Sequence, residues 1–192
     1  MKQTISKLFV LLLFLPGIAL AHTGIGQTTG FMHGFGHPIG GADHVLAMVA
    51  VGIWAAQMNG RALWVVPCTF VGVMVFGGAL GFTGVPVPFV EEGILVSILI
   101  LGVLIAGAFK LPLIFGSLIV GIFAIFHGHA HGSEMPASIS AVSYAVGFAL
   151  ATAMLHLGGI GLGMLMRKTN LQVVSRIAGG AIALSGIYLA FA

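Results

Sequence analysis

Long apolar runs, separated by short polar breaks, occupy most of this 192-residue chain. Only 6% of the residues are charged and 59% are hydrophobic, and the mean hydropathy is +1.17. A soluble domain carries about 25% charged residues, so this chain has too few charges to cover a surface that faces water. The composition therefore predicts an integral membrane protein whose apolar runs cross the bilayer as helices.

The apolar runs form six segments that follow an N-terminal leader. The segments cover residues 38–57, 62–82, 93–109, 111–127, 138–165 and 173–192. Residues 1–21 have the basic start, the short apolar core and the Ala-Leu-Ala ending of a cleaved signal peptide; a retained anchor helix is the alternative. We expect an all-α, polytopic membrane protein, with a signal peptide over 1–21, six transmembrane helices over 22–192 and the N-terminus outside.

The charges between the segments give an independent test of this topology. With the N-terminus outside, every lysine and arginine of the mature chain falls on the inner side, whereas Glu91, Glu92 and Glu134 fall outside. Lysine and arginine are enriched in cytoplasmic loops, so the charges fit six spans and not an odd number. Basic residues scattered in this way are orientation signals, and the net charge of +3 does not indicate a nucleic-acid partner.

A first group of ionisable side chains lies at the start of the first segment, where such groups are costly and indicate function. His33, His37, Asp43 and His44 all occur there. Pro38 suits the first position of a helix and disfavours helix at His37, so we expect His33 to precede the helix. His37 and His44, seven residues apart, share a face if the backbone between them is helical. Asp43 can ligate a metal directly or accept a hydrogen bond from an imidazole.

A second group closes the fourth segment, in the sequence FHGHAHGSE at residues 126–134. On a helix, His127, His131 and Glu134 form one stripe and His129 points elsewhere. In the expected topology both groups lie at the outer surface or in the outer half of the membrane. A single such histidine is ordinarily a buried polar residue, but two groups at one level favour metal binding. Imidazoles and carboxylates without thiolates suit divalent Ni, Co, Zn or Cu, and the ligand types do not rank these metals further.

Four histidines are additional candidates for metal binding: His22, His33, His129 and His156. His22 becomes the N-terminus after cleavage, where its amine and imidazole could chelate a metal; an unligated terminus is the alternative. His156 lies nearer the inner side and could serve the exit of an ion, with ordinary packing as the alternative. More than four candidates at an outward-facing end fit capture and passage better than a closed structural site.

The thirty glycines fit a membrane protein, because small residues let helices pack closely. The GxxxG spacing occurs at Gly77/Gly81, Gly128/Gly132 and Gly159/Gly163. In a chain so rich in glycine, each of these pairs taken singly is best explained by chance.

Two long motifs resemble the signatures of the HupE/UreJ family. Residues 37–44, HPIGGADH, match the pattern HPxxGxDH, and residues 126–134 match FHGxAHGxE. The length, the signal peptide and the six segments are similar too, so the resemblance covers the whole chain. The family's functional positions correspond here to His37, Asp43, His44, His127, His131 and Glu134, without a departure at any of them.

The resemblance implies a nickel or cobalt permease of the bacterial inner (cytoplasmic) membrane that supplies hydrogenase or urease. We therefore expect Ni2+, with Co2+ as the second ion, to be carried from periplasm to cytoplasm for metalloenzyme maturation. We expect no tightly bound cofactor and no enzymatic activity. The expected partners are the divalent metal ion, the lipid bilayer and metallochaperones of hydrogenase or urease.

Three alternatives remain: an intramembrane metalloenzyme, a metal-binding sensor or scaffold, and a purely structural protein. The chain contains no GxxxxGK[ST] phosphate-binding loop. We therefore expect facilitated movement of the metal down its gradient, set by the membrane potential and by trapping in the cytoplasm; a coupling that the sequence does not reveal is the alternative.

Overall fold

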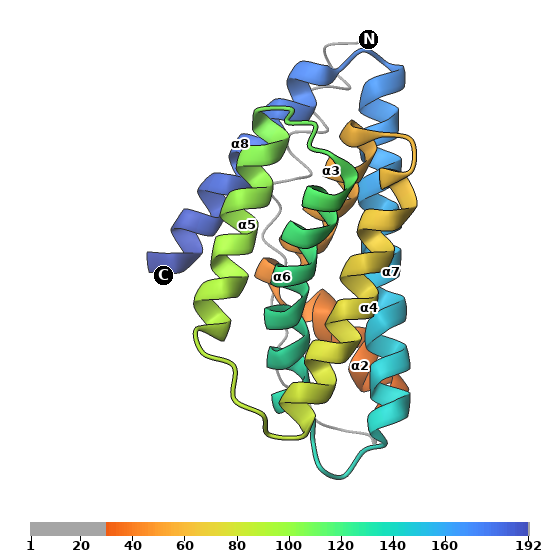
Figure 1. Ribbon diagram of the computed structural model, residues 1–192, viewed down its shortest axis with the longest axis vertical. Helices are drawn as coiled ribbons and strands as arrows, with labels where there is room; N and C mark the ends of the chain where they lie inside the picture. The colour runs from red at the N-terminus through yellow and green to blue at the C-terminus, as the bar shows by residue number, and fades with distance from the viewer. Residues whose placement is uncertain (1–29, 192) are drawn as a thin grey trace.

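The computed structural model describes residues 30–191, and every regular element in this part of the chain is an α-helix (Figure 1). Seven helices occupy it: α2 (Gly30–Gly40), α3 (Ala42–Met58), α4 (Ala62–Phe82), α5 (Val90–Ala106), α6 (Leu113–Ser133), α7 (Ala141–Lys168) and α8 (Gln172–Phe191). The all-α prediction is confirmed. The expected signal peptide over 1–21 and His22 lie outside the described residues.

Four of these helices, α4, α6, α7 and α8, are each long and apolar enough to cross a membrane. Helices α2 and α3 meet at an angle of 82° and make a fifth span if the bent pair is one broken span. Helix α5 has 17 residues, somewhat fewer than the roughly 20 of a typical crossing. The helices are those of a multi-pass membrane protein, and the number six stays a prediction.

The prediction that His33 precedes the first helix is wrong. Helix α2 contains both His33 and His37, and Pro38 lies in its last turn instead of opening the next helix. Packing on α7 explains why the helix persists to Pro38, since Gly34 touches the backbone of Tyr144 directly. This tertiary contact outweighs the preference of the residue before proline for an extended backbone.

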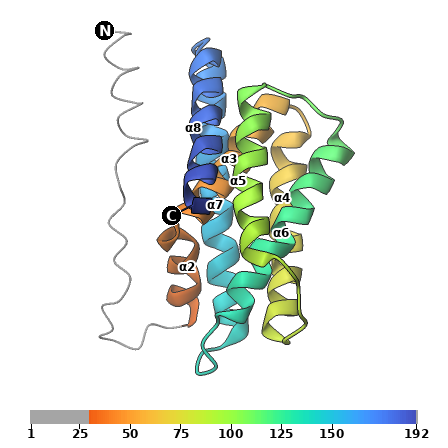
Figure 2. The same cartoon turned by 90° about the vertical axis from the view of Figure 1, so that its left-hand side faces the viewer.

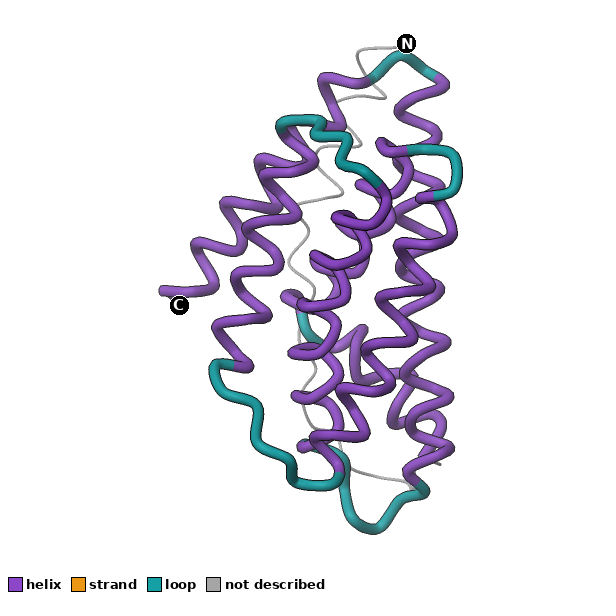
Figure 3. The backbone as a smooth tube through the Cα atoms, viewed as in Figure 1, coloured by secondary structure: helices purple, strands orange, loops and turns teal. Residues whose placement is uncertain are grey.

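The break in the first segment falls at Gly41, between α2 and α3 (Figure 3). Its extended backbone, with φ −103° and ψ 124°, separates the two helices and allows the 82° bend. His37 and His44 therefore lie on two differently directed helices and do not share a helix face. The bend still leaves both side chains free to approach α6.

The loops gather at two ends of the molecule (Figures 1 and 3). The loops 59–61, 107–112 and 169–171 lie at what we call the basic end, together with Arg61, Lys110, Arg167 and Lys168. The loops 83–89 and 134–140 lie at the opposite end, the acidic end, together with Glu91, Glu92 and Glu134. Charges of opposite sign are thus separated along the helix bundle, as the sequence predicted.

Glycines set the close approach of α4 and α6, which run side by side in both ribbon views (Figures 1 and 2). A methyl group on Gly128 would collide with the carbonyl oxygen of Met74, and one on Gly132 with that of Gly78. Gly77 and Gly81 of α4 approach the backbone of α6 in the same way. Gly159 and Gly163 of α7 approach α3. The GxxxG pairs are therefore packing motifs, and their explanation by chance is wrong.

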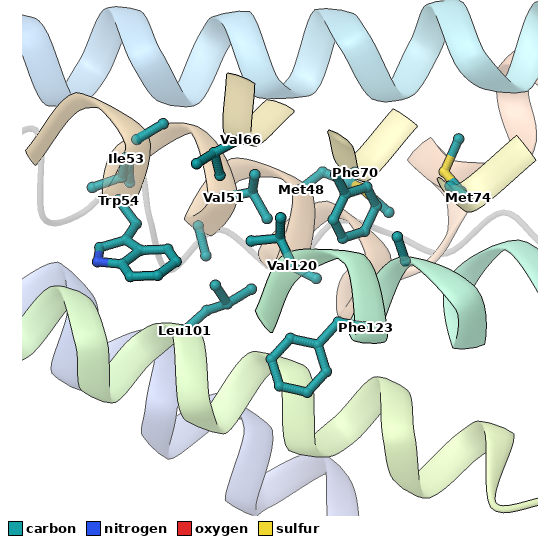
Figure 4. Close-up of a cluster of buried hydrophobic side chains, with 14 of the residues drawn as sticks. Met48, Val51, Ile53, Trp54, Val66, Phe70, Met74, Leu101, Val120 and Phe123 are labelled. Atoms are coloured by element: carbon teal, nitrogen blue, oxygen red, sulfur yellow. The ribbon is translucent and has the colours of Figure 1, made fainter. Parts of the chain in front are cut away.

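The apolar core lies between α3, α4, α5 and α6 (Figure 4). Trp54 and Val51 of α3, and Val66, Phe70 and Met74 of α4, are all fully buried in it. These side chains extend along the bundle from the side of the basic end toward that of the acidic end. They separate the polar groups of the two ends.

We expect Gly128→Ala to destabilise the bundle and Gly72→Ala on α4 to leave it unchanged or more stable. Both changes raise helix propensity, but only the first places a methyl group against a backbone carbonyl; a methyl group on Gly72 meets nothing within 4 Å. Overpacking of this kind costs about 1–3 kcal/mol. Thermal unfolding of the two variants in detergent measures the difference, and equal melting temperatures would contradict it.

Candidate metal centre

Imidazole rings from α2, α3 and α6 meet in the half of the bundle toward the acidic end. The ring centroids of His37 and His131 are 4.6 Å apart, those of His44 and His131 are 4.3 Å apart, and those of His44 and His127 are 4.9 Å apart. His127 and His131 lie one turn apart on α6, so that helix links the rings of α2 and α3. The two motifs of the sequence thus form one continuous group of histidines.

The outermost part of this group is the surface triad of His37, His131 and Glu134. Their ligand atoms all lie within 4.8 Å of one another, and Glu134 Oε2 is 3.6 Å from His37 Nε2. Metal–nitrogen and metal–oxygen bonds are about 2.0–2.2 Å long, so these atoms need only a small contraction to bind one cation. Glu134 is exposed and His131 is buried, at 3%, so the triad joins the surface to the interior.

The hydrogen bonds of the triad leave one nitrogen of His131 free. His37 Nδ1 lies 2.7 Å from His131 Nδ1 and 2.6 Å from the hydroxyl oxygen of Tyr144. His37 Nδ1 offers either one N–H or one lone pair, so it can pair fully with only one of these groups, and in one arrangement it accepts the imidazole N–H of His131. His131 Nε2 then carries a bare lone pair, and that atom is buried without a hydrogen-bond partner.

Behind the triad lies the buried histidine pair, His44 and His127. Asp43 Oδ1 lies 3.0 Å from His44 Nδ1, so the carboxylate accepts the N–H of that imidazole. The other nitrogen, His44 Nε2, is buried and has no hydrogen-bond partner. A carboxylate that orients an imidazole in this way raises its basicity as a metal ligand, and this is one of the two roles the sequence predicted for Asp43.

His127, which is fully buried, shows the same division between its two nitrogens. Its Nε2 lies 3.0 Å from the Ser97 hydroxyl, and that hydroxyl donates its single proton to the carbonyl oxygen of Ile94 at 2.6 Å. Ser97 can therefore only accept, which makes His127 Nε2 the donor. His127 Nδ1 is left buried, with a lone pair and no partner.

Three neighbouring imidazoles, those of His44, His127 and His131, thus each have a polar partner at one nitrogen and none at the other. An unpaired buried polar atom costs free energy, and such atoms in native structures call for an ion, a water or a functional role. Neutral imidazole is a ligand for divalent transition metals. The arrangement therefore offers donor atoms that could bind a divalent cation, from the surface triad to the buried pair.

The additional candidates lie at different distances from this centre. His33 is half-buried, with its ring 5.9 Å from that of His37 and 6.0 Å from that of Tyr144, so it borders the triad. His129 points away and contacts the backbone oxygen of Val85 at 2.9 Å, as the helix stripe predicted. His156 lies deeper in the bundle.

Sequence reasoning missed Tyr144 and Ser97, which contact His37 and His127. Both residues carried a detectable signal. Ser97 is a hydroxyl residue within an otherwise apolar segment, and Tyr144 is one of only two tyrosines in the chain. Nothing in the sequence indicated that α5 and α7 bring them to the histidines, because those contacts are set by the packing of distant helices.

Helices long and apolar enough to cross a bilayer, together with the cluster of histidines between them, define a multi-pass membrane protein with a candidate metal centre. The sequence model described as "HupE / UreJ protein" matches residues 10–189, and the chain belongs to that family. Members of the family are accessory proteins of hydrogenase and urease. The curated Protein HupE of Rhizobium leguminosarum bv. viciae is 48% identical over 177 residues, which cover 92% of each chain. No solved structure matches the chain.

We expect Gly41→Ala to weaken binding of Co2+ by about 10-fold or more, the size of effect seen when the partner of a ligating imidazole is disturbed. A methyl group on Gly41 would lie 2.6 Å from Asp43 Oδ1 and 3.2 Å from His44 Nδ1, so both must move. Gly40→Ala is the matched control, because a methyl group there meets nothing within 4 Å. Titration calorimetry in detergent measures both affinities, and equal affinities would contradict the prediction.

Proposed function

We propose that this protein is a permease for Ni2+, with Co2+ as a second substrate, that carries the ion from the periplasm to the cytoplasm. The observation that carries the proposal is the row of unpartnered imidazole nitrogens that leads inward from the exposed carboxylate of Glu134. Membership of a family linked to hydrogenase and urease supports nickel as the ion. The protein would lie in the bacterial inner membrane with its acidic end outside.

In this proposal the ion is first captured by Glu134 and His37, which are accessible from the acidic end. His131 then replaces a water ligand of the ion, because its Nε2 is buried and has no hydrogen-bond partner. His44 and His127 replace further waters as the ion moves inward. A pathway of several weak sites lets an ion enter without becoming trapped, and the shared ring of His131 joins the two parts of the pathway.

The charge distribution supports this direction. Lysine and arginine mark the cytoplasmic side of membrane proteins, and here they gather at the end opposite to the histidines. A divalent cation that moves inward gains about 4.6 kcal/mol per 100 mV of membrane potential, twice the value for a single charge. The membrane potential and capture of the metal in the cytoplasm therefore suffice as driving forces, and metallochaperones of hydrogenase or urease are the proposed acceptors.

We expect His37→Ala and Asp43→Ala to abolish Ni2+ flux into proteoliposomes that contain a trapped metal-sensitive dye. The first removes a ligand of the surface triad, and the second removes the acceptor that holds His44. His129→Ala, on the same helix as His131, is the control and retains the flux, because that side chain points to Val85 instead of the centre. All three variants remain in the membrane at the level of the unaltered protein.

Other outcomes would favour the alternative functions. Tight binding at a fixed stoichiometry without flux indicates a sensor or a scaffold for metallochaperones. Turnover of a substrate while the metal stays bound indicates an intramembrane metalloenzyme. Normal flux by both His37→Ala and Asp43→Ala at low metal concentration would end the proposal, since the residues that carry it would then be dispensable.

A further inference from the structure

His156 on α7 differs from the other histidines of the described chain. Both of its ring nitrogens are buried and neither has a hydrogen-bond partner, and only 1% of the residue is exposed. A neutral imidazole presents one donor and one acceptor, so this side chain leaves both unsatisfied inside an apolar bundle. Such a group in a native structure requires a ligand or a functional reason.

The position of His156 on α7 links it to the metal centre. Tyr144, Phe148, Thr152 and His156 follow one another at four-residue intervals and are all buried, so they form one stripe on the helix. The stripe begins at the centre, where Tyr144 contacts His37 and the ring of Phe148 lies 4.2 Å from that of His131. His156 comes eight residues after Phe148, about 12 Å further along the helix axis.

One aromatic ring connects His156 to the buried histidine pair. The ring centroid of Phe70, on α4, lies 5.6 Å from that of His127 and 5.1 Å from that of His156. One turn away on α4, Met74 accepts a contact from the Thr152 hydroxyl at 3.6 Å, and Figure 4 shows Phe70 and Met74 in the core. The Phe70 ring is thus in contact with both imidazoles and links His156 to the buried histidine pair.

Toward the basic end from His156, the fully buried side chains of the core are apolar, and the polar side chains there include those of Gln57 and Ser175. Val51, Trp54 and Val66 are fully buried in that direction. His156 is thus the last side chain with a free metal-ligating nitrogen before the apolar layer that closes the bundle.

We propose that His156 is a second metal-ligating site, which receives a divalent transition-metal ion from His127. The inference rests on the proposed transport function and adds a second binding site, deeper in the bundle, to the path of the ion. The ligand on the protein side is the imidazole of His156, and the Thr152 hydroxyl, which contacts Met74, lies one turn away on the same helix. Imidazole suits Ni2+ and its neighbouring transition metals and not Mg2+ or Ca2+, which take oxygen ligands; waters brought by the ion complete its coordination.

The test compares His156→Gln and His156→Leu with Met154→Leu, using Co2+ as the probe. Met154 lies on the same helix two residues away and is 53% exposed, so it controls for changes in α7. We expect both His156 variants to lower the maximal Co2+ flux into proteoliposomes at least 10-fold. The half-saturating concentration, and Co2+ binding to the centre in detergent, stay within twofold of the unaltered protein, and Met154→Leu behaves as the unaltered protein does.

Two results of this comparison would overturn the inference. Flux at the unaltered level in either well-folded His156 variant shows that the imidazole is dispensable. A parallel loss of flux and of Co2+ binding at the centre shows that His156 only supports the structure of that centre.

Anomalous scattering at the cobalt absorption edge, from crystals of the unaltered protein soaked in Co2+, tests the site without any substitution. A peak at a bonding distance of about 2.1 Å from a ring nitrogen of His156 supports the inference, and peaks confined to the centre overturn it. This measurement also separates the two proposals. If the unaltered protein carries no flux, the transport proposal fails, and the cobalt peaks alone decide whether His156 binds metal.

Discussion

The structure depends on the shortage of hydrogen-bond partners inside an apolar helix bundle, where a histidine cannot satisfy both of its ring nitrogens. Each buried histidine of the centre finds one hydrogen-bond partner on a neighbouring group, namely His37, Asp43 or Ser97. No further polar group is close enough to satisfy the second nitrogen of any of them, and in lipid no bulk water can do so. The partner orients each ring and leaves the other nitrogen unpaired, and the proposed metal binding makes use of that nitrogen.

This arrangement requires helix backbones that approach one another closely. Gly128 and Gly132 lie on the same stretch of α6 as His127 and His131, and they bring that helix against α4. Larger residues at these positions would push α6 outward and move both histidines away from α2 and α3. Histidine thus alternates with small residues over 127–132. The glycines set the distance between α6 and α4, and this distance places His127 and His131 beside the histidines of α2 and α3.

Much of this was predictable from the sequence, because hydropathy, charge and motif spacing are local signals. The limits 62–82 of the second segment agree with α4, and the stripe of His127 and His131 was evident from four-residue spacing. The continuation of α2 through His33 and Pro38 was not, because the contact of Gly34 with α7 maintains the helix there. For the same reason the roles of Tyr144 and Ser97 were missed, since each contacts a histidine on a helix far away in the chain.

The described conformation is closed toward the basic end. A doubly charged ion that lost its water beside the side chains of Val51 and Val66 would find no ligand atom on them, at a large cost in free energy. Beyond this layer, Lys110, Arg167 and Arg176 line a cavity of about 170 Å³, where their positive charges oppose a cation. Under the proposed transport function, release of the ion requires a rearrangement that admits water to this layer. The backbones of α3 and α7 touch at Gly52 and Gly159, so rotation of side chains alone cannot separate these two helices.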